Sequence, residues 1–170
     1  MASNINNLSH YNSKVIPSAS AYNFGIVLSA YHNEITNALK NACIETLLKH
    51  DAQESNIHLL EVPGAYELVY GAKLIAETQK LSAVITLGCV IKGETEHDRY
   101  INQAVAQSLM NLNLVLKIPF IFGLLTPNTL QQAKDRAGGK HGNKGTEAAI
   151  TAIQMANLNN KLTKRKAIGF

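Results

Sequence analysis

The segment AVITLGCVI, residues 83–91, decides the fold, because it is the most apolar run in the chain and is rich in β-branched residues. An apolar run of this length, with no alternation, is typical of a strand that is buried on both faces in a parallel sheet. We therefore predict a central strand at this position.

Similar but shorter apolar segments lie on both sides of it. The predicted strands are residues 24–30, 56–62 and 119–125. Between the strands, apolar residues recur at spacings of three and four, which indicates amphipathic helices. The predicted helices are residues 35–50, 65–78, one whose apolar positions run from 101 to 115, a short one ending at 136, and 144–159. Strands that alternate with helices predict an α/β domain whose four-stranded parallel sheet is covered on both faces.

The length and charge indicate one domain with a neutral body. A chain of 170 residues with 46% hydrophobic and 16% charged residues excludes a wholly disordered or disulfide-dense protein. The net charge of +4 lies in the last ten residues, which leaves twelve basic and twelve acidic residues before them. We therefore predict no nucleic-acid binding, and divide the chain into a flexible arm (1–14), a domain (15–160) and a basic tail (161–170).

The expected location is the cytoplasm. Cys43 and Cys89 lie far apart in apolar segments, as reduced thiols of cytosolic proteins do. No apolar run reaches the length of a membrane span, and the first 14 residues have no signal-peptide pattern. We expect no membrane association.

Ligands of an open parallel sheet bind at the carboxyl ends of its strands. The loops predicted there are residues 30–33, 63–67, 92–97 and 126–127. In the third loop, Gly93 and Thr95 precede a helix whose backbone N–H groups can hold an anion. His97 follows and can move a proton near neutral pH, although its spacing fits an ordinary first-turn histidine equally well.

Basic and aromatic residues supply further candidates. Arg136 and Lys144 flank a Gly-rich bend and either bind phosphate or are simply cations at helix ends, favourably placed for Arg136 at a C-terminus and unfavourably for Lys144 at an N-terminus. Tyr31, Tyr66 and Phe122 lie at or near predicted strand ends, where they can stack on a ligand or pack against the core.

Glu67 begins a helix and is either a favourable N-terminal acid or an acceptor for ligand hydroxyls. The chain has no CxxC, HExxH, GxSxG or EF-hand motif, so the sequence predicts no metal site. Two other uses of the same fold are poorly matched. The loop at 30–33 is a poor version of the hydroxyl- and glycine-rich loop of an FMN site, and it lacks the paired acids of a receiver domain.

Four motifs together resemble the 6,7-dimethyl-8-ribityllumazine synthase family, over residues 24–158 and in the same order. They are PGAYE (63–67), LGCVIKGETEH (87–97), FGLLT (122–126) and RAGGKHGNKGTEAA (136–149). The resemblance implies a flavodoxin-like three-layer α/β/α sandwich. It also implies a transferase of riboflavin biosynthesis that needs no cofactor and condenses 5-amino-6-(D-ribitylamino)uracil with 3,4-dihydroxy-2-butanone 4-phosphate to 6,7-dimethyl-8-ribityllumazine, phosphate and water.

The same resemblance assigns roles to residues. His97 is the implied acid/base, and Tyr31 is implied to stack on the pyrimidine ring. The implied contacts to the ribityl chain and the pyrimidine edge are Ala65, Tyr66, Glu67, Val90 and Ile91. The implied phosphate contacts are Gly93, Glu94, Thr95 and Arg136, with Lys144 close by. Phe122, Arg136 and Lys144 are expected to come from a neighbouring subunit.

Assembly follows from the resemblance as well. It implies a homo-oligomer, namely a pentamer and further a 60-subunit icosahedral shell, with the segment around 15–16 adding an edge strand to a neighbour. It also implies association with riboflavin synthase.

Four positions depart from the family's usual pattern: Ala30 and Lys92 each replace Arg, His32 replaces Asn, and Asp98 replaces an aromatic residue. The alternative function is a catalytically silent paralogue that binds riboflavin or its precursors.

Overall fold

The structure, a computed structural model, describes residues 9–168, so residues 1–8 of the predicted arm and 169–170 of the predicted tail lie outside it. The sheet consists of β1 (Phe24–Ser29), β2 (Ile57–Val62), β3 (Ala83–Cys89) and β4 (Phe120–Leu125). All four strands are parallel in the order β2-β1-β3-β4. This is the strand order of flavodoxin-like folds, which confirms the predicted fold class.

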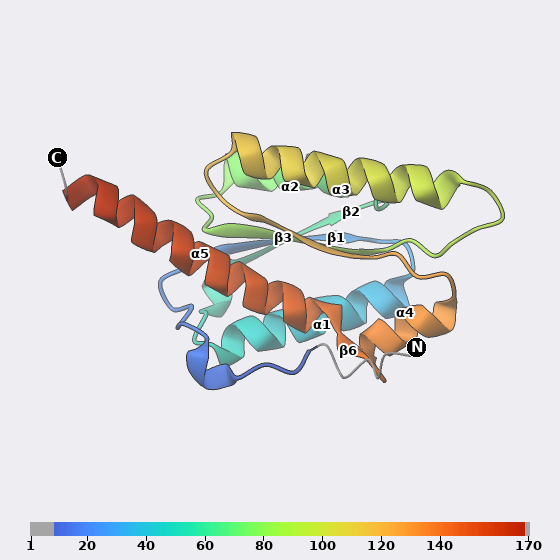
Figure 1. Cartoon of the computed structure of the whole chain (residues 1–170), viewed down its shortest axis with the longest axis horizontal. Helices are drawn as coiled ribbons and strands as arrows, with labels where there is room; N and C mark the ends of the chain where they lie inside the picture. Colours follow the sequence, from blue (N-terminus) through green and yellow to red (C-terminus); the bar gives the residue numbers. More distant parts are fainter. Residues whose placement is uncertain (1–8, 169–170) are drawn as a thin grey trace, which may run out of the picture.

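Helices cover both faces of this sheet. They are α1 (Asn33–Lys49), α2 (Leu68–Thr78), α3 (His97–Val115), α4 (Leu130–Arg136) and α5 (Lys144–Ile168). Helices α2 and α3 lie on one face, and α1 and α5 lie on the other (Figure 1). The result is the predicted three-layer sandwich.

The central strand β3 is buried along its whole length. Its side chains alternate between the two cores: Ile85 and Leu87 pack towards α1 and α5, whereas Val84 packs towards α2 and α3. The buried hydroxyl of Thr86 donates to the carbonyl of Ile121, at 3.0 Å, so its polar group is satisfied. The most apolar run in the sequence is therefore an interior strand, as predicted.

A short hairpin joins α4 to α5. It consists of β5 (Ala137–Gly139) and β6 (Gly142–Asn143). Gly138 and Gly142 have φ values of 117° and 83°, which residues with a Cβ rarely adopt. The predicted Gly-rich break is therefore a tight turn that brings the end of α4 beside the start of α5.

Two predicted helix boundaries are wrong. The last helix does not end at 159, because α5 runs to Ile168 and includes most of the segment predicted as a separate basic tail. That segment holds no Pro or Gly before residue 169, so nothing in it stops a helix. Helix α2 begins at Leu68 and not at 65, because residues 63–67 form the turn that follows β2.

The N-terminal segment contacts the rest of the chain. The Ser9 hydroxyl lies within hydrogen-bonding distance of the backbone of Asn143, and the Tyr11 hydroxyl lies 3.2 Å from Nε2 of His50. Residues Ser13–Val15 form a 3₁₀ turn, so in the single chain the segment around 15–16 is not a strand of the sheet. Within residues 9–168, no helix is long and apolar enough to cross a membrane.

Gly145 sets how closely α5 approaches α1, and we predict that Gly145→Ala destabilises the fold. A Cβ on Gly145 would lie 1.9 Å from the carbonyl oxygen of Leu39, so the two helices would have to move apart. We expect a loss of about 1–3 kcal/mol in the free energy of unfolding, measured by denaturant titration. Gly93→Ala is the matched control, because a Cβ there meets nothing within 4 Å. Equal stability of the two variants would contradict this packing.

Candidate active site

A cavity of ≈ 950 Å³ lies at the carboxyl ends of β1, β2 and β3. Seven of the residues singled out from the sequence line it: Tyr31, Ala65, Tyr66, Glu67, Val90, Ile91 and His97. They come from three loops and from the start of α3, and the parallel strands bring these segments together. Its position is the one where open α/β sheets bind their ligands.

The loops after β1 and β2 meet at Gly64. A Cβ on Gly64 would lie 2.8 Å from a carboxylate oxygen of Glu67 and 3.4 Å from the ring of Tyr31, so both side chains lie beside this glycine. The backbone N–H of Ala30 donates to the carbonyl of Val62 at 2.9 Å, which ties the two strand ends together. An aromatic ring and a carboxylate therefore flank one stretch of the cavity wall.

His97 is the first residue of α3, and its side chain is exposed at the cavity. Its backbone N–H points at the hydroxyl oxygen of Thr95, 3.4 Å away, and the N–H of Gly93 points at a carboxylate oxygen of Asp98, 3.5 Å away. Asp98, the departure noted after the histidine, thus lies against the loop at 92–97. Gly93, Glu94 and Thr95 are exposed in this loop but do not line the cavity.

Cys89 ends β3 and also lines the cavity. Burial raises the pKa of its thiol to about 11, so the thiol is protonated and poorly nucleophilic near neutral pH. Burial also raises the pKa of Cys43 above its usual range. Both cysteines are free, as predicted. The described part of the chain contains no group of three or more His, Cys, Asp and Glu residues that could hold a metal ion.

Arg136, Lys144 and Glu147 form a second cluster. Nη1 of Arg136 lies 2.7 Å from Oε1 of Glu147, and Nζ of Lys144 lies 3.2 Å from Oε2. Burial alone would raise the pKa of Glu147, but the hydrogen bond from Arg136 and the charges of Lys144 and Arg136 hold it below its usual value. The carboxylate is therefore ionised at neutral pH and pairs with both cations.

The two groups of candidates lie apart, because neither Arg136 nor Lys144 lines the cavity, although Cys89 and Ile91 of its wall pack with the core under α1 and α5. Ala65, Val90 and Ile101 of the cavity wall belong to the core under α2 and α3, whereas the cluster follows Ala133 of α4, which packs with α1 and α5. Phe122 is part-exposed on β4, an edge strand, and does not line the cavity. Within the single chain, Phe122, Arg136 and Lys144 therefore do not join His97.

Several cavity residues were not predicted as site residues. Tyr100, Ile101 and Ala104 lie three, four and seven positions after His97, so the helical period places them on its face of α3. These three residues could therefore have been predicted from the helical spacing after His97. His32, Pro63 and Gly64 also line the cavity, beside residues that were predicted. His32 has a φ of 56°, which is uncommon for a residue with a side chain and is not readable from its neighbours.

A flavodoxin-like α/β protein with a ligand-sized cavity at the carboxyl edge of its sheet belongs to a broad class of ligand-binding proteins and enzymes. Comparison with known proteins narrows this class. The family model described as 6,7-dimethyl-8-ribityllumazine synthase matches residues 21–160. The chain belongs to this family.

Curated relatives support the same assignment. A 6,7-dimethyl-8-ribityllumazine synthase of Parabacteroides distasonis is 50% identical over 158 residues, which is 93% of this chain and 99% of the relative. The protein of that name in Flavobacterium psychrophilum is 52% identical over 158 residues, covering 93% of this chain and 84% of the relative. That of Phocaeicola vulgatus is 46% identical over 164 residues, covering 96% and 98%.

Proposed function

We propose that the chain condenses 5-amino-6-(D-ribitylamino)uracil with 3,4-dihydroxy-2-butanone 4-phosphate to 6,7-dimethyl-8-ribityllumazine, phosphate and water. The observation that carries this proposal is one cavity lined by Tyr31, Glu67 and His97 in a member of the synthase family. The amine adds to the ketone, water leaves to give an imine, phosphate leaves by elimination, and the second ring closes with loss of water. Each of these steps moves a proton.

His97 is the proposed acid/base because its imidazole lies at the cavity and can both accept and donate a proton near neutral pH. Tyr31 stacks on the pyrimidine, and Glu67 accepts hydrogen bonds from the ribityl hydroxyls, with Ala65 and Tyr66 beside it. The N–H of Val90 donates to the carbonyl of Leu125 within the sheet. This N–H is already occupied, so the other backbone polar groups of Val90 and Ile91 are the ones that read the pyrimidine edge.

Phosphate binding is assigned to Arg136, with Lys144 nearby and with Gly93, Glu94 and Thr95 from the loop before α3. Because Arg136, Lys144 and Phe122 do not line the cavity of their own chain, we propose that they act in the cavity of an adjacent subunit. A homo-oligomer then provides the complete site. We place this activity in the cytoplasm.

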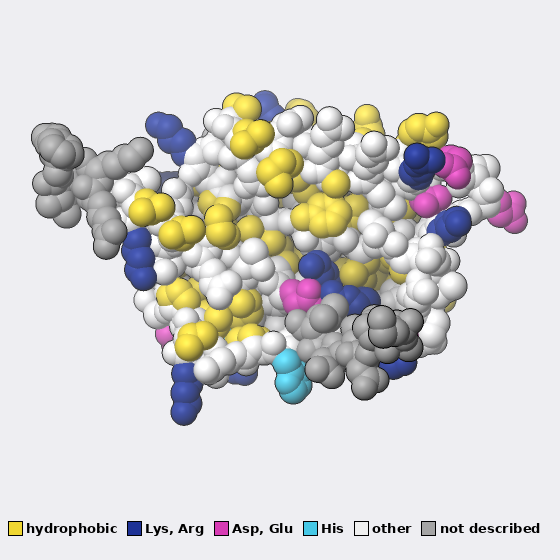
Figure 2. All heavy atoms as spheres, viewed as in Figure 1, with side chains coloured by type: hydrophobic (Ala, Val, Ile, Leu, Met, Phe, Trp, Pro, Cys, Tyr) yellow, Lys and Arg dark blue, Asp and Glu magenta, His cyan; other side chains and the backbone are white. Residues whose placement is uncertain are grey.

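The surface of the single chain supports an oligomer. Hydrophobic side chains gather on the face shared by α3, β4 and α5 (Figure 2), and basic and acidic side chains lie together beside them over the start of α5. The exposed apolar residues on these elements are Met110, Leu114, Val115, Phe122, Met155, Leu158 and Leu162. A contiguous apolar patch is typical of a protein interface. We propose that further copies of the chain cover it, in a pentamer.

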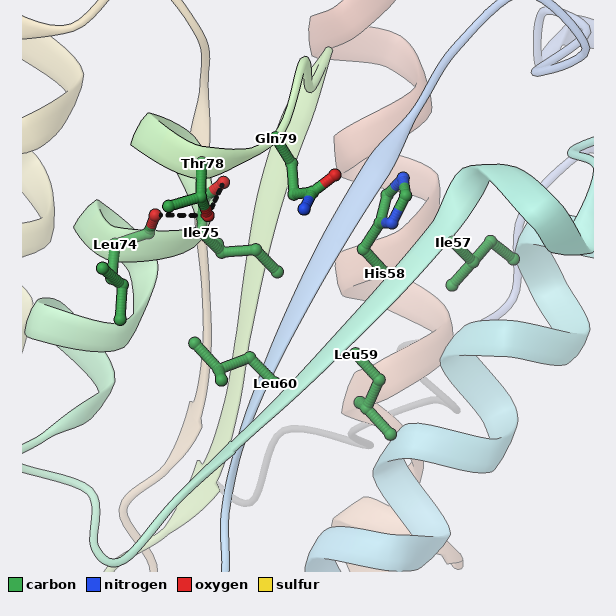
Figure 3. A pocket seen from close by; sticks show the side chains of 8 residues that line it. All are labelled: Ile57, His58, Leu59, Leu60, Leu74, Ile75, Thr78 and Gln79. Carbon is green, nitrogen blue, oxygen red and sulfur yellow. Dashed lines mark hydrogen bonds between the residues drawn. The ribbon is translucent and has the colours of Figure 1, made fainter.

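A second hollow supports larger assembly. A groove of ≈ 520 Å³ lies between the edge strand β2 and helix α2, flanked by Leu59 and Leu60 on the strand and Leu74 on the helix (Figure 3). Leu59 is half-exposed there. An extended segment can pair with such an edge. We propose that the segment around 15–16 of a neighbour adds a strand here, that pentamers build a 60-subunit shell, and that riboflavin synthase associates with it.

Activity is tested by mixing the purified protein with both substrates and following lumazine fluorescence. A rate no higher than the spontaneous one would contradict the proposed function and favour a silent paralogue.

His97→Ala is expected to lower kcat by about 10²-fold or more, with little change in either KM, because it removes the acid/base. Arg136→Ala is expected to raise the KM for the butanone phosphate about tenfold or more, because it removes a charge-assisted hydrogen bond to phosphate. Steady-state kinetics measure both, and His10→Ala, which changes an exposed histidine outside the cavity, is the control. Kinetics like wild type in the two site variants would refute the assignments.

Assembly is tested by analytical ultracentrifugation. We expect a species of shell size for the wild type, and much smaller species for Leu114→Glu, because a charge on the apolar patch opposes its burial. Leu48→Glu, the same substitution at an exposed leucine of α1 outside this face (41% exposed, against 79% for Leu114), should leave the assembly intact. A wild type that sediments as one or two pentamers with nothing larger would contradict the shell.

A further inference from the structure

Glu147 holds both cations of the second cluster and was not among the residues singled out from the sequence. Nη2 of Arg136 donates to Oε2 of Glu147 at 3.0 Å, and Nζ of Lys144 donates to the same oxygen at 3.2 Å. Arg136 also donates through Nη1 to the carbonyl of His141 at 2.8 Å, and the same nitrogen lies 2.7 Å from Oε1 of Glu147. The guanidinium is therefore held by a carboxylate and a backbone carbonyl together.

The cluster is rigidly supported. Glu147 lies in the first turn of α5, where a negative charge is favourable, and Arg136 ends α4, where a positive charge is favourable. The hairpin between them turns at Gly138 and Gly142, and Gly145 packs against the backbone of Leu39. The side chains of Arg136 and Glu147 are 20% and 18% exposed, so water screens their interaction less than at an open surface.

We propose that Glu147 is a positioning residue for the phosphate-bearing substrate: it fixes the guanidinium of Arg136 and the ammonium of Lys144 in the orientation that binds the phosphate. This inference rests on the proposed function of Arg136. A guanidinium has five N–H donors. Two of them donate to Glu147 and His141, so donors remain with which Arg136 binds an anion.

Charge and position make opposite predictions for the loss of Glu147. Two cations and one carboxylate give the cluster a net charge of +1. Removal of the carboxylate raises that charge to +2, so if charge alone mattered a phosphate would bind more tightly. If Glu147 acts by fixing the two cations, its removal frees their long side chains, and ordering them again on binding weakens the affinity for phosphate.

The test compares Glu147→Ala and Glu147→Gln with wild type in two measurements. We expect Glu147→Ala to raise the KM for the butanone phosphate about tenfold, with kcat at saturation and the KM for the aminouracil changed less than twofold. We expect the dissociation constant of inorganic phosphate, from titration calorimetry, to rise in parallel. Glu147→Gln keeps the shape and one acceptor oxygen, so its KM should lie between those of wild type and Glu147→Ala.

Glu34→Gln is the matched control. Glu34 of α1 pairs at 3.0 Å with Lys134, which lies on α4 like Arg136 but is not part of the cluster. It should leave both KM values and phosphate binding unchanged. Tighter phosphate binding by the Glu147 variants, or an equal rise of the two KM values, would overturn the proposal. Phosphate titration does not depend on turnover, so the two proposals can fail separately. Absence of lumazine formation by the wild type refutes the proposed function. Unchanged phosphate affinity in both Glu147 variants refutes the role of Glu147.

Discussion

Parallel pairing of β1 with β3 is the constraint on which the rest of the structure depends. The two strands pair in register from Phe24 opposite Ala83 to Leu28 opposite Leu87, and both are buried on both faces. Parallel neighbours need long crossovers, which here contain the helices that cover the two faces. The same geometry places the ends of all four strands at one edge. Residues that are far apart in sequence, such as Tyr31, Glu67 and His97, therefore line one cavity.

The physical patterns that predict the fold are mainly those of the interior. The apolar run at 83–91 can be satisfied only by burial, so it identifies the central strand without reference to its partners. Boundaries at the surface depend on weaker preferences. The charge of the segment after 159 predicts a solvated tail, yet no Pro or Gly occurs in it before residue 169, and α5 continues to Ile168. The position of the N-terminal segment depends on contacts with residues far away in the sequence, such as the one between Tyr11 and His50.

The same distinction holds for the site. The rule that ligands bind at the carboxyl edge, with the motifs of the family, identifies seven residues of the cavity wall. Tyr100 and Ala104 follow from the period of α3 once His97 is chosen. Glu147 does not follow from its own position, because an acid in the first turn of a helix is favourable on its own. Its contacts depend on the hairpin that returns Arg136 to the start of α5.

Our central claim is that a complete site needs two copies of the chain, one supplying the cavity with His97 and the other supplying Arg136. Coexpression of His97→Ala and Arg136→Ala chains, assayed at a butanone phosphate concentration well below the wild-type KM, tests it most directly. In a closed ring with equal random mixing, about a quarter of the sites combine an intact cavity with an intact arginine, so about a quarter of wild-type activity should return. Activity no greater than the average of the two variants assembled separately would contradict a site shared between copies.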